Sequence, residues 1–436
     1  MNIINEIGKN SITNITFNQD NSCFAISTEK GFKIYNSYPF EGPYERLMGG
    51  GLGVVEMLYK SNYLALIGGG KSPQFSNNKL VIWDENSKKI IGELKFILPI
   101  INIKLKKGLL FVVCLKRIYL FDFNTYDIID TIETGDNIKG LITINNSPNN
   151  TVFAFPSEKD LNWVTIKKIK SKKDLIFEAQ ADKVSHMSIN YDGTLLATAN
   201  EKGTIINIHS CTDGKWLKSF KRGHNKVENI FICFDKDNKF MAISSNKGTI
   251  HIFSLKSIIK IFKDKEEKDK EKKEEKDKEK KEEKDKDKNE NKDIINDNKK
   301  EYKKENKIEN DNKNEQESKY EITNENKLKK TEDLINNKEK EELRNKNKKE
   351  IKKENEDNKN NIINENKTNE QYPDNFKNLF GTEKSFAKVR IKPQKNICAF
   401  IRSNLLIIVS FDNKYYQAEI DLTKGGICKI LTEKTI

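Results

Sequence analysis

Cysteine pairs, long apolar runs and leader-like segments are scarce in this sequence. Its six cysteines are scattered and none forms a Cys-x-x-Cys pair, so neither a disulfide framework nor a zinc site is expected. We expect these thiols to be small buried groups in a reducing compartment. The N-terminus has no basic stretch followed by an apolar one, so no signal peptide is expected. The most apolar region, 96–115, is interrupted by Lys104, Lys106 and Lys107, which argues against a membrane span.

Motifs for catalysis are missing as well. The run 67–72 ends like a phosphate-binding P-loop, but Ala65 stands where the first glycine is required and Pro73 where a helix should begin. A tight inter-strand turn explains it better. The sequence contains neither a Gly-x-Ser-x-Gly elbow nor a His-Glu-x-x-His motif, and its four histidines suggest no triad. We therefore predict a protein that is not an enzyme and needs no cofactor or metal.

Charge is distributed very unevenly along the chain. The segment 261–370 holds 34 of the 79 Lys and Arg residues and 35 of the 66 Asp and Glu residues, so the remaining chain carries a net charge of +14. An excess of this size favours an anionic partner: a membrane surface, a phosphorylated ligand or nucleic acid. Because no aromatic-interleaved platform for stacking bases is present, nucleic-acid binding is not expected.

The segment 261–370 is a low-complexity tract that passes from Glu-Lys-Asp-Lys repeats into Asn-rich sequence. It has too little apolar surface to offset chain entropy, so we predict a disordered insertion. A tolerated surface-loop expansion and a tract that binds a partner are both open interpretations. The predicted boundaries are 1–260 for the folded part before it and 371–436 for the part that follows.

Strand-like runs recur along the ordered chain. Their centres are separated by 48, 38, 44, 44 and 44 residues, and a seventh run follows the insertion near residue 414. Those centres are Ile34, Ile82, Leu120, Val164, Ile208 and Ile252. A period of about 40–45 residues is typical of a four-stranded propeller blade, and Trp83-Asp84 supplies the WD dipeptide once. We predict an all-β, seven-bladed, WD-repeat-like β-propeller with the insertion in a sixth-blade loop, in preference to a β-sandwich.

The stretch Phe220-Lys221-Arg222-Gly223 places two cations side by side. Because side chains alternate along extended backbone, the two cations can serve two separate anionic pockets. Each pocket would be completed by a neighbouring polar turn, 200–204 or 244–251. A solvated turn with two charges is the alternative interpretation.

Several separated motifs resemble those of the PROPPIN family, called WIPI proteins in animals. They lie at 18–24, 55–70, 81–84, 200–204, 244–253 and 385–388, with Phe220–Gly223 in the place of the family's Phe/Leu-Arg-Arg-Gly hallmark. The resemblance implies a seven-bladed propeller that binds phosphoinositides at two sites on its rim. It is closest to the shorter WIPI proteins that pair with a bridge-like lipid-transfer autophagy protein.

The resemblance also assigns residues to the two lipid sites. The second site would use Arg222 with Ser244, Ser245, Thr249 and His251, although Gln180 stands where the family has a further histidine. The first would use Lys221 with Thr204 and Asn200, and Asn207 replaces a family arginine there. Lysine cannot grip a phosphate bidentately as arginine does, so the second site is favoured. Both cations are expected to be exposed at the rim.

By the same resemblance, the chain is predicted to read phosphatidylinositol 3-phosphate, with the 3,5-bisphosphate as a second ligand. The sixth-blade loop that enters the bilayer in the family is too charged to do so here, and 372–380 is the nearby apolar candidate. Asn18 and Asp20, in an exposed loop, are candidates for partner binding. A monomeric, cytoplasmic protein on endosomal, vacuolar or autophagosomal membranes is expected. The Asn/Lys bias leaves a plastid-derived organelle open, and a scaffold that has lost lipid binding is the alternative function.

Overall fold

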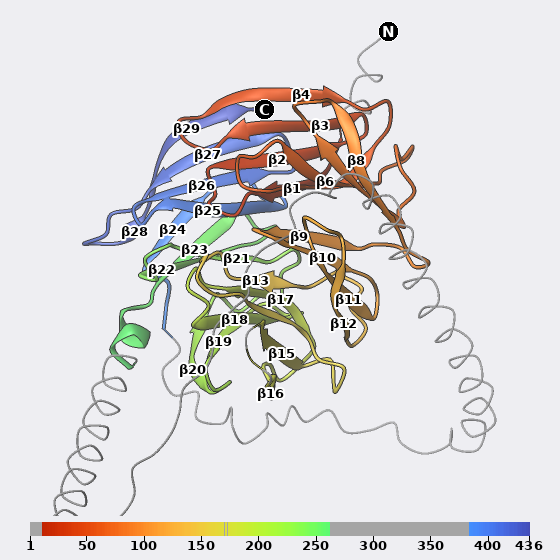
Figure 1. Cartoon of the computed structure of the whole chain (residues 1–436). Helices are drawn as coiled ribbons and strands as arrows, with labels where there is room; N and C mark the ends of the chain where they lie inside the picture. The colour runs from red at the N-terminus through yellow and green to blue at the C-terminus, as the bar shows by residue number, and fades with distance from the viewer. Residues whose placement is uncertain (1–10, 170, 172, 262–382) are drawn as a thin grey trace, which may run out of the picture. The chain divides into compact units, whose positions relative to one another are not determined.

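The computed structural model describes residues 11–169, 171, 173–261 and 383–436. The chain divides into two compact units, one of Met1–Leu255 with Thr323–Ile436 and the other of Lys256–Ile322. The described residues of the first unit form strands and the turns that join them (Figure 1). Within the described residues, helix is confined to 256–261 in the second unit, and no helix there is long and apolar enough to cross a bilayer.

The strands of the first unit form seven sheets, each from one continuous stretch of chain apart from the sixth. Blades 1 to 4 comprise β1 (Ile12–Phe17), β2 (Cys23–Thr28), β3 (Gly31–Asn36) and β4 (Glu41–Leu47); β5 (Leu52–Met57), β6 (Tyr63–Gly68), β7 (Lys79–Asp84) and β8 (Lys89–Lys95); β9 (Asn102–Lys106), β10 (Leu109–Val113), β11 (Arg117–Asp122) and β12 (Ile128–Glu133); and β13 (Thr143–Ile144), β14 (Val152–Pro156), β15 (Trp163–Lys168) and β16 (Leu175–Glu178).

Blade 5 follows with β17 (Val184–Ile189), β18 (Leu195–Asn200), β19 (Ile205–Ser210) and β20 (Trp216–Lys221). Blade 6 has β21 (Phe231–Phe234), β22 (Phe240–Ser244), β23 (Thr249–Ser254), β24 (Ala387–Arg390) and, parallel to β24 at its edge, β28 (Gly426–Ile427). Blade 7 has β25 (Asn396–Arg402), β26 (Leu405–Ser410), β27 (Lys414–Glu419) and β29 (Lys429–Thr435). The seven-bladed propeller is thereby confirmed.

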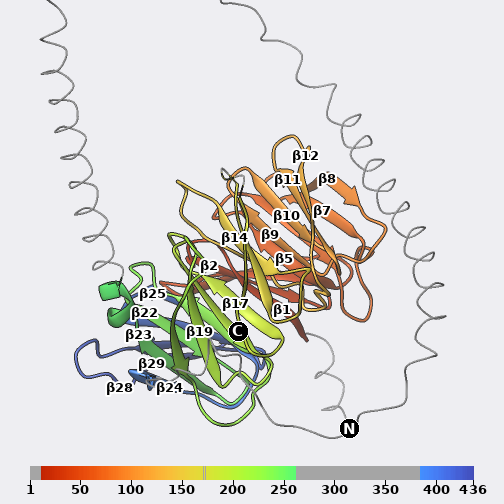
Figure 2. The ribbon, with the colours of Figure 1, turned by 90° about the horizontal axis from the view of Figure 1, so that it is seen from below.

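Both faces of each inner strand are buried, which explains why the strands read as apolar runs without strict alternation. All six residues of β26 are buried, for example. Each core cluster joins neighbouring blades, and one containing Phe24 of blade 1 and Ile407 of blade 7 closes the ring. In Figure 1 the colours accordingly pass round from red in blade 1 to blue in blade 7, and Figure 2 shows the same blades from below. Radial repetition of the blades leaves only short strand edges, which lie at the rim and around the centre.

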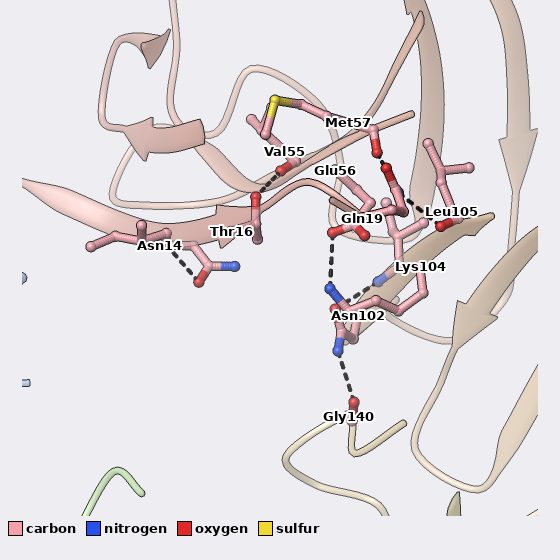
Figure 3. A network of polar contacts seen from close by, with 12 residues as sticks. Asn14, Thr16, Gln19, Val55, Glu56, Met57, Asn102, Lys104, Leu105 and Gly140 are labelled. Carbon is pink, nitrogen blue, oxygen red and sulfur yellow. Dashed lines mark hydrogen bonds and ion pairs between the residues drawn. The ribbon is translucent and has the colours of Figure 1, made fainter. Parts of the chain in front are cut away.

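Polar side chains on the innermost strands, or in the turn that follows β1, connect blade 1 with blades 2 and 3 and blade 2 with blade 3. Thr16 Oγ1 donates to Val55 O at 2.6 Å, and Gln19 Nε2 donates to Leu105 O at 2.9 Å (Figure 3). An ion pair of 2.9 Å joins Lys104 Nζ of blade 3 to the buried Glu56 of blade 2. Burial outweighs this partner and raises the pKa of Glu56.

The long insertion lies where the topology places it, between β23 and β24 of the sixth blade. These two strands pair directly, with His251 opposite Lys388, although residues 262–382 separate them in the chain. The predicted disorder of 261–370, its boundaries and the apolar cluster 372–380 fall almost wholly outside the described residues and stay predictions.

Candidate phosphate-binding site between blades 5 and 6

Lys221 ends β20 and Arg222 follows it directly, and the two motif cations lie on opposite faces of this extended segment. Phe220 packs against Phe253 of β23, with ring centroids 5.1 Å apart. Ser219, one residue earlier, instead donates its hydroxyl to Asn207 Oδ1 at 2.7 Å, within blade 5. Because alternate residues share a face, Lys221 lies on the side of Ser219 and Arg222 on the side of Phe220, toward blade 6.

Arg222 is buried, with 8% of its surface exposed. Its Nε donates to Gly203 O at 2.6 Å, and its guanidinium also donates to Asn225 O. The prediction that this residue is exposed at the rim is therefore wrong, because these two carbonyls hold the guanidinium between the blades. Burial lowers the pKa of Arg222. Among the described residues no carboxylate pairs with it, so its positive charge is compensated only by neutral acceptors.

Thr249 and His251 face Arg222 from blade 6. They share a face of β23 with Phe253, the residue that touches Phe220. The Nδ1 atom of His251 lies 3.4 Å from Ser385 Oγ. Burial, and then the charges of Lys388 and Arg222, lower the pKa of His251 to about 4. The imidazole is therefore neutral at pH 7, and Arg222 lies close enough for its positive charge to lower the pKa of His251.

The two predicted serines separate at the end of β22. Ser244 is fully buried and donates its hydroxyl to Asn396 O of blade 7 at 3.3 Å, so it turns away from Arg222. Ser245 is 1% exposed, and its hydroxyl has no hydrogen-bond partner in the described part of the chain. Ser245 follows the last residue of β22, and alternation continued past the strand end places it on the face of Ile243, which pairs with His251. The structure thus groups Arg222, Ser245, Thr249 and His251 and leaves Ser244 out.

The first predicted site is largely committed to internal contacts. Asn200 Oδ1 accepts from the backbone N–H of Gly203 at 3.0 Å, and Asn200 Nδ2 lies 3.5 Å from a carboxylate oxygen of Asp182. Thr204 is half-buried, and its carbonyl accepts from Arg222 N at 2.9 Å. Lys221 is half-buried as well. Asp182, whose carboxylate lies next to Asn200 and also pairs with Lys202 Nζ at 3.6 Å, offsets the positive charge available to an anion here.

The two departures from the family pattern near these sites are structural residues. Asn207 is buried and donates to Ala179 O at 3.0 Å. Gln180 is buried and donates to Thr198 O at 2.8 Å. Neither side chain offers a group to a ligand.

Two cations that the motif analysis did not assign lie beside the second site. In β24, Lys388 pairs with His251 and Arg390 pairs with Thr249, so each shares the face of its partner. Arg390 is exposed and Lys388 is half-buried. The cross-strand register would have identified them, but β23 and β24 are separated by more than a hundred residues of chain.

The proposed partner-binding loop contains one buried residue. Asn18 is 2% exposed; its Oδ1 accepts from Cys23 N at 3.0 Å and its Nδ2 donates to Ser22 Oγ at 3.0 Å. It therefore shapes the turn, and the prediction that it is exposed is wrong. Asp20 is exposed and accepts from the Ser22 hydroxyl at 2.6 Å.

The geometry defines a β-propeller with a cationic, hydroxyl-bearing seam between two blades. No group of three or more His, Cys, Asp or Glu residues suited to a metal occurs in the described ranges. A model of the PROPPIN family matches residues 11–269, and the chain belongs to that family.

Individual relatives and structures agree with this membership. Autophagy-related protein 18 of Yarrowia lipolytica is 34% identical over 269 residues, covering 57% of this chain and 67% of that protein. A structure of Kluyveromyces lactis Hsv2 with its complete loop 6CD shares 18% identity at a TM-score of 0.60, covering 98% and 100% of the two chains. The complex of KlAtg21 with the coiled coil of AgAtg16 contains a fold matching at the same identity and TM-score, covering 98% and 99%. These structures show the shared fold.

Proposed function

We propose that this PROPPIN is a non-enzymatic effector that reads phosphatidylinositol 3-phosphate on membranes and recruits autophagy and lipid-transfer machinery. The 3,5-bisphosphate is its second ligand. The proposal is carried by the buried guanidinium of Arg222, which has no carboxylate partner in the described residues and lies on the side of blade 5 that faces blade 6. Burying a charge without an opposite charge is costly, so such a site is poised to accept an anion.

The surroundings of Arg222 match the chemistry of a phosphate monoester. That group carries nearly two negative charges and three strong acceptor oxygens. Arg222 supplies a charge and N–H donors, and the half-buried hydroxyl of Thr249 supplies another donor. The unpartnered hydroxyl of Ser245 provides a third, and Lys388 adds positive charge. Since His251 is neutral at pH 7, it contributes one N–H donor rather than a full charge.

The carboxylate of Asp182 beside Asn200 favours a second candidate in part, namely a propeller whose first lipid site is weak and whose main role is to hold proteins together. The KlAtg21 complex with a coiled coil shows that the same fold can carry a protein partner. For this chain we propose a bridge-like lipid-transfer protein of autophagy, with Asp20 as a contact. Endosomal, vacuolar and autophagosomal membranes are the proposed locations, with a plastid-derived organelle as the alternative.

Flotation with vesicles that contain phosphatidylinositol 3-phosphate tests the lipid-effector function. We expect Arg222→Thr to weaken binding about 10-fold or more, since a hydrogen bond to a charged group contributes about 1.5–3 kcal/mol. Lys221→Thr should weaken it less, because the first site is committed to internal contacts. The control is Lys95→Thr. Lys95 ends the outermost strand of blade 2 as Lys221 ends the outermost strand of blade 5, and this variant should float like the wild type.

The buried position of Arg222 changes the expected stability of its variant. Loss of its two carbonyl contacts should cost about 1–3 kcal/mol rather than the few tenths usual at a surface. Each variant is therefore checked for a cooperative thermal transition, and flotation is measured well below it. Undiminished flotation of the folded Lys221→Thr/Arg222→Thr double variant would contradict the lipid-effector function and leave the propeller that holds proteins together as the remaining candidate.

A further inference from the structure

One rung of the blade 6 sheet runs from the core to the rim through the proposed lipid site. The paired residues are Ile243 of β22, His251 of β23, Lys388 of β24 and Ile427 of β28. Adjacent strands lie about 4.8 Å apart, so Ile427 stands roughly 10 Å outward from His251. From inside to outside, the rung presents a phosphate-facing imidazole, a cation and an aliphatic side chain.

The outermost residue of this rung is strongly exposed. Ile427 is 63% exposed, whereas its neighbour Cys428 is 8% exposed and packs into the core cluster between blades 6 and 7. Gly425 makes the approach to β24 possible: its φ is +65°, and an added Cβ would lie 2.3 Å from Phe386 O. In both Figure 1 and Figure 2, β28 lies beside β24 at the margin of the blade.

The segment 422–431, called here the rim segment, contains further exposed aliphatic side chains before and after Ile427 in the sequence. Leu422 is 39% exposed, Ile430 39% and Leu431 45%. Exposed cations stand among them at Lys424 and Lys429, and Arg390 is exposed on the adjoining strand. Two exposed carboxylates, Glu419 and Asp421, lie just before the segment. Clustered exposed aliphatic groups mark interaction sites more often than single ones do.

We propose that the rim segment is a membrane-contacting surface. Ile427 and Leu431 enter the interfacial layer of the bilayer, and the inner part of the rung that ends at Ile427 binds a phosphoinositide of the same bilayer. This inference rests on the proposed lipid-effector function. Charge supports a lipid occupant, because Lys424, Lys429 and Arg390 suit an anionic leaflet. Continuity supports it too, since a lipid held at His251 with its acyl chains directed outward passes Lys388 before it reaches Ile427.

The rim segment also supplies a second membrane signal. Head-group binding alone gives marginal attachment, and stable anchoring usually takes an additional apolar or electrostatic contact. Transfer of one aliphatic side chain out of water changes partitioning by about tenfold or more. The rim segment offers such side chains within the described fold, next to the head-group site.

The test compares two pairs of variants with matched exposure. Ile427→Asp/Leu431→Asp changes side chains that are 63% and 45% exposed, and Leu47→Asp/Ile91→Asp changes outer-strand side chains of blades 1 and 2 that are 67% and 44% exposed. On phosphatidylinositol 3-phosphate vesicles, the rim pair should float at least about tenfold less than the wild type, and the control pair should float like it.

Depth is read separately with a tryptophan probe. Ile427→Trp should show extra fluorescence quenching by phosphatidylcholine with brominated acyl chains, relative to the wild type and to Leu47→Trp. Wild-type flotation with unchanged flotation of the rim pair, or the absence of extra quenching in Ile427→Trp, overturns this inference alone. If the rim pair floats normally but co-purifies less of a protein partner than the wild type does, the membrane contact is overturned in favour of a protein contact. Failure of the wild type to float overturns the lipid-effector function and, with it, this inference.

Discussion

At the scale of single residues, Ser244 and Ser245 form a natural matched pair. The Ser244 hydroxyl is used by the fold, whereas the buried Ser245 hydroxyl has no partner among the described residues and lies on the face of His251. A buried hydroxyl without a hydrogen-bond partner lowers stability. A ligand that accepts a hydrogen bond from this hydroxyl can offset the loss.

We expect Ser245→Ala to leave stability unchanged or raise it by up to about 1 kcal/mol while it weakens binding to phosphatidylinositol 3-phosphate. Ser244→Ala should do the reverse, losing about 0.5–1.5 kcal/mol with unchanged binding by the folded protein. Urea unfolding and vesicle flotation of both variants measure these effects. Equal losses of binding in the two variants would show that Ser245 acts only through packing.

The histidines determine part of the pH dependence of stability. Burial, with a contribution from Lys139, lowers the pKa of His186 from 6.5 to about 4, and its Nε2 accepts from Ile232 N at 3.3 Å. Between pH 6.5 and 4 the unfolded chain binds more protons at this residue, so the stability that His186 contributes is complete above pH 6.5 and falls as the pH falls toward 4.

Replacing His186 by glutamine should flatten this dependence. We expect the wild type to lose about 1–3 kcal/mol more than His186→Gln when the pH is lowered from 7 to 4.5. The difference between the two proteins isolates the histidine from Glu56 and Asp235, whose pKa values are raised by burial and whose titration acts in the opposite direction. If the stability of the two proteins falls in parallel as the pH is lowered, the role assigned to His186 is contradicted.

At the scale of elements, β24 brings cations to a site that β20 and β23 begin. Lys388→Ala/Arg390→Ala should weaken vesicle binding by about 1 kcal/mol for each charge, with a smaller effect at high salt. Lys89→Ala/Lys95→Ala removes two exposed cations from β8, the outermost strand of blade 2, and is expected to have no effect. Flotation at two salt concentrations distinguishes these outcomes. Equal losses of vesicle binding in both pairs would show that the cations of β24 act only as general surface charge.

How well the sequence predicts each element depends on whether local or distant pairing defines it. The 44-residue spacing predicts the blades because every blade repeats the same local order of strands. Alternation along β20 likewise predicts that Lys221 and Arg222 face different ways. The burial of Arg222 depends on the carbonyls of Gly203 and Asn225, and the placement of Lys388 depends on pairing across 262–382. Neither of these contacts leaves a periodic signal.

At the scale of the whole molecule, the position of the insertion predicts that it is dispensable for folding. It joins β23 and β24, which already pair with each other. Replacing 263–369 by a short flexible linker should preserve the cooperative thermal transition, since loop length changes closure entropy only slowly. Calorimetry of the deletion protein checks this expectation. A broad or absent transition would show that the insertion contributes to the fold.

The seam between blade 1 and blade 7 also determines the order in which the ring can assemble. It joins the most distant parts of the described chain, as in the bond of 2.6 Å from Tyr415 Oη to Ser37 O, which spans 378 residues. Every other seam is formed by blades that follow one another in sequence. Contacts between sequence neighbours form fastest, so this seam should be the last to gain protection in pulsed hydrogen exchange during refolding. Side chains alone hold this seam, whereas β28 of the C-terminal segment pairs into the sheet of blade 6, so under tension the ring should part here before it parts between blades 6 and 7.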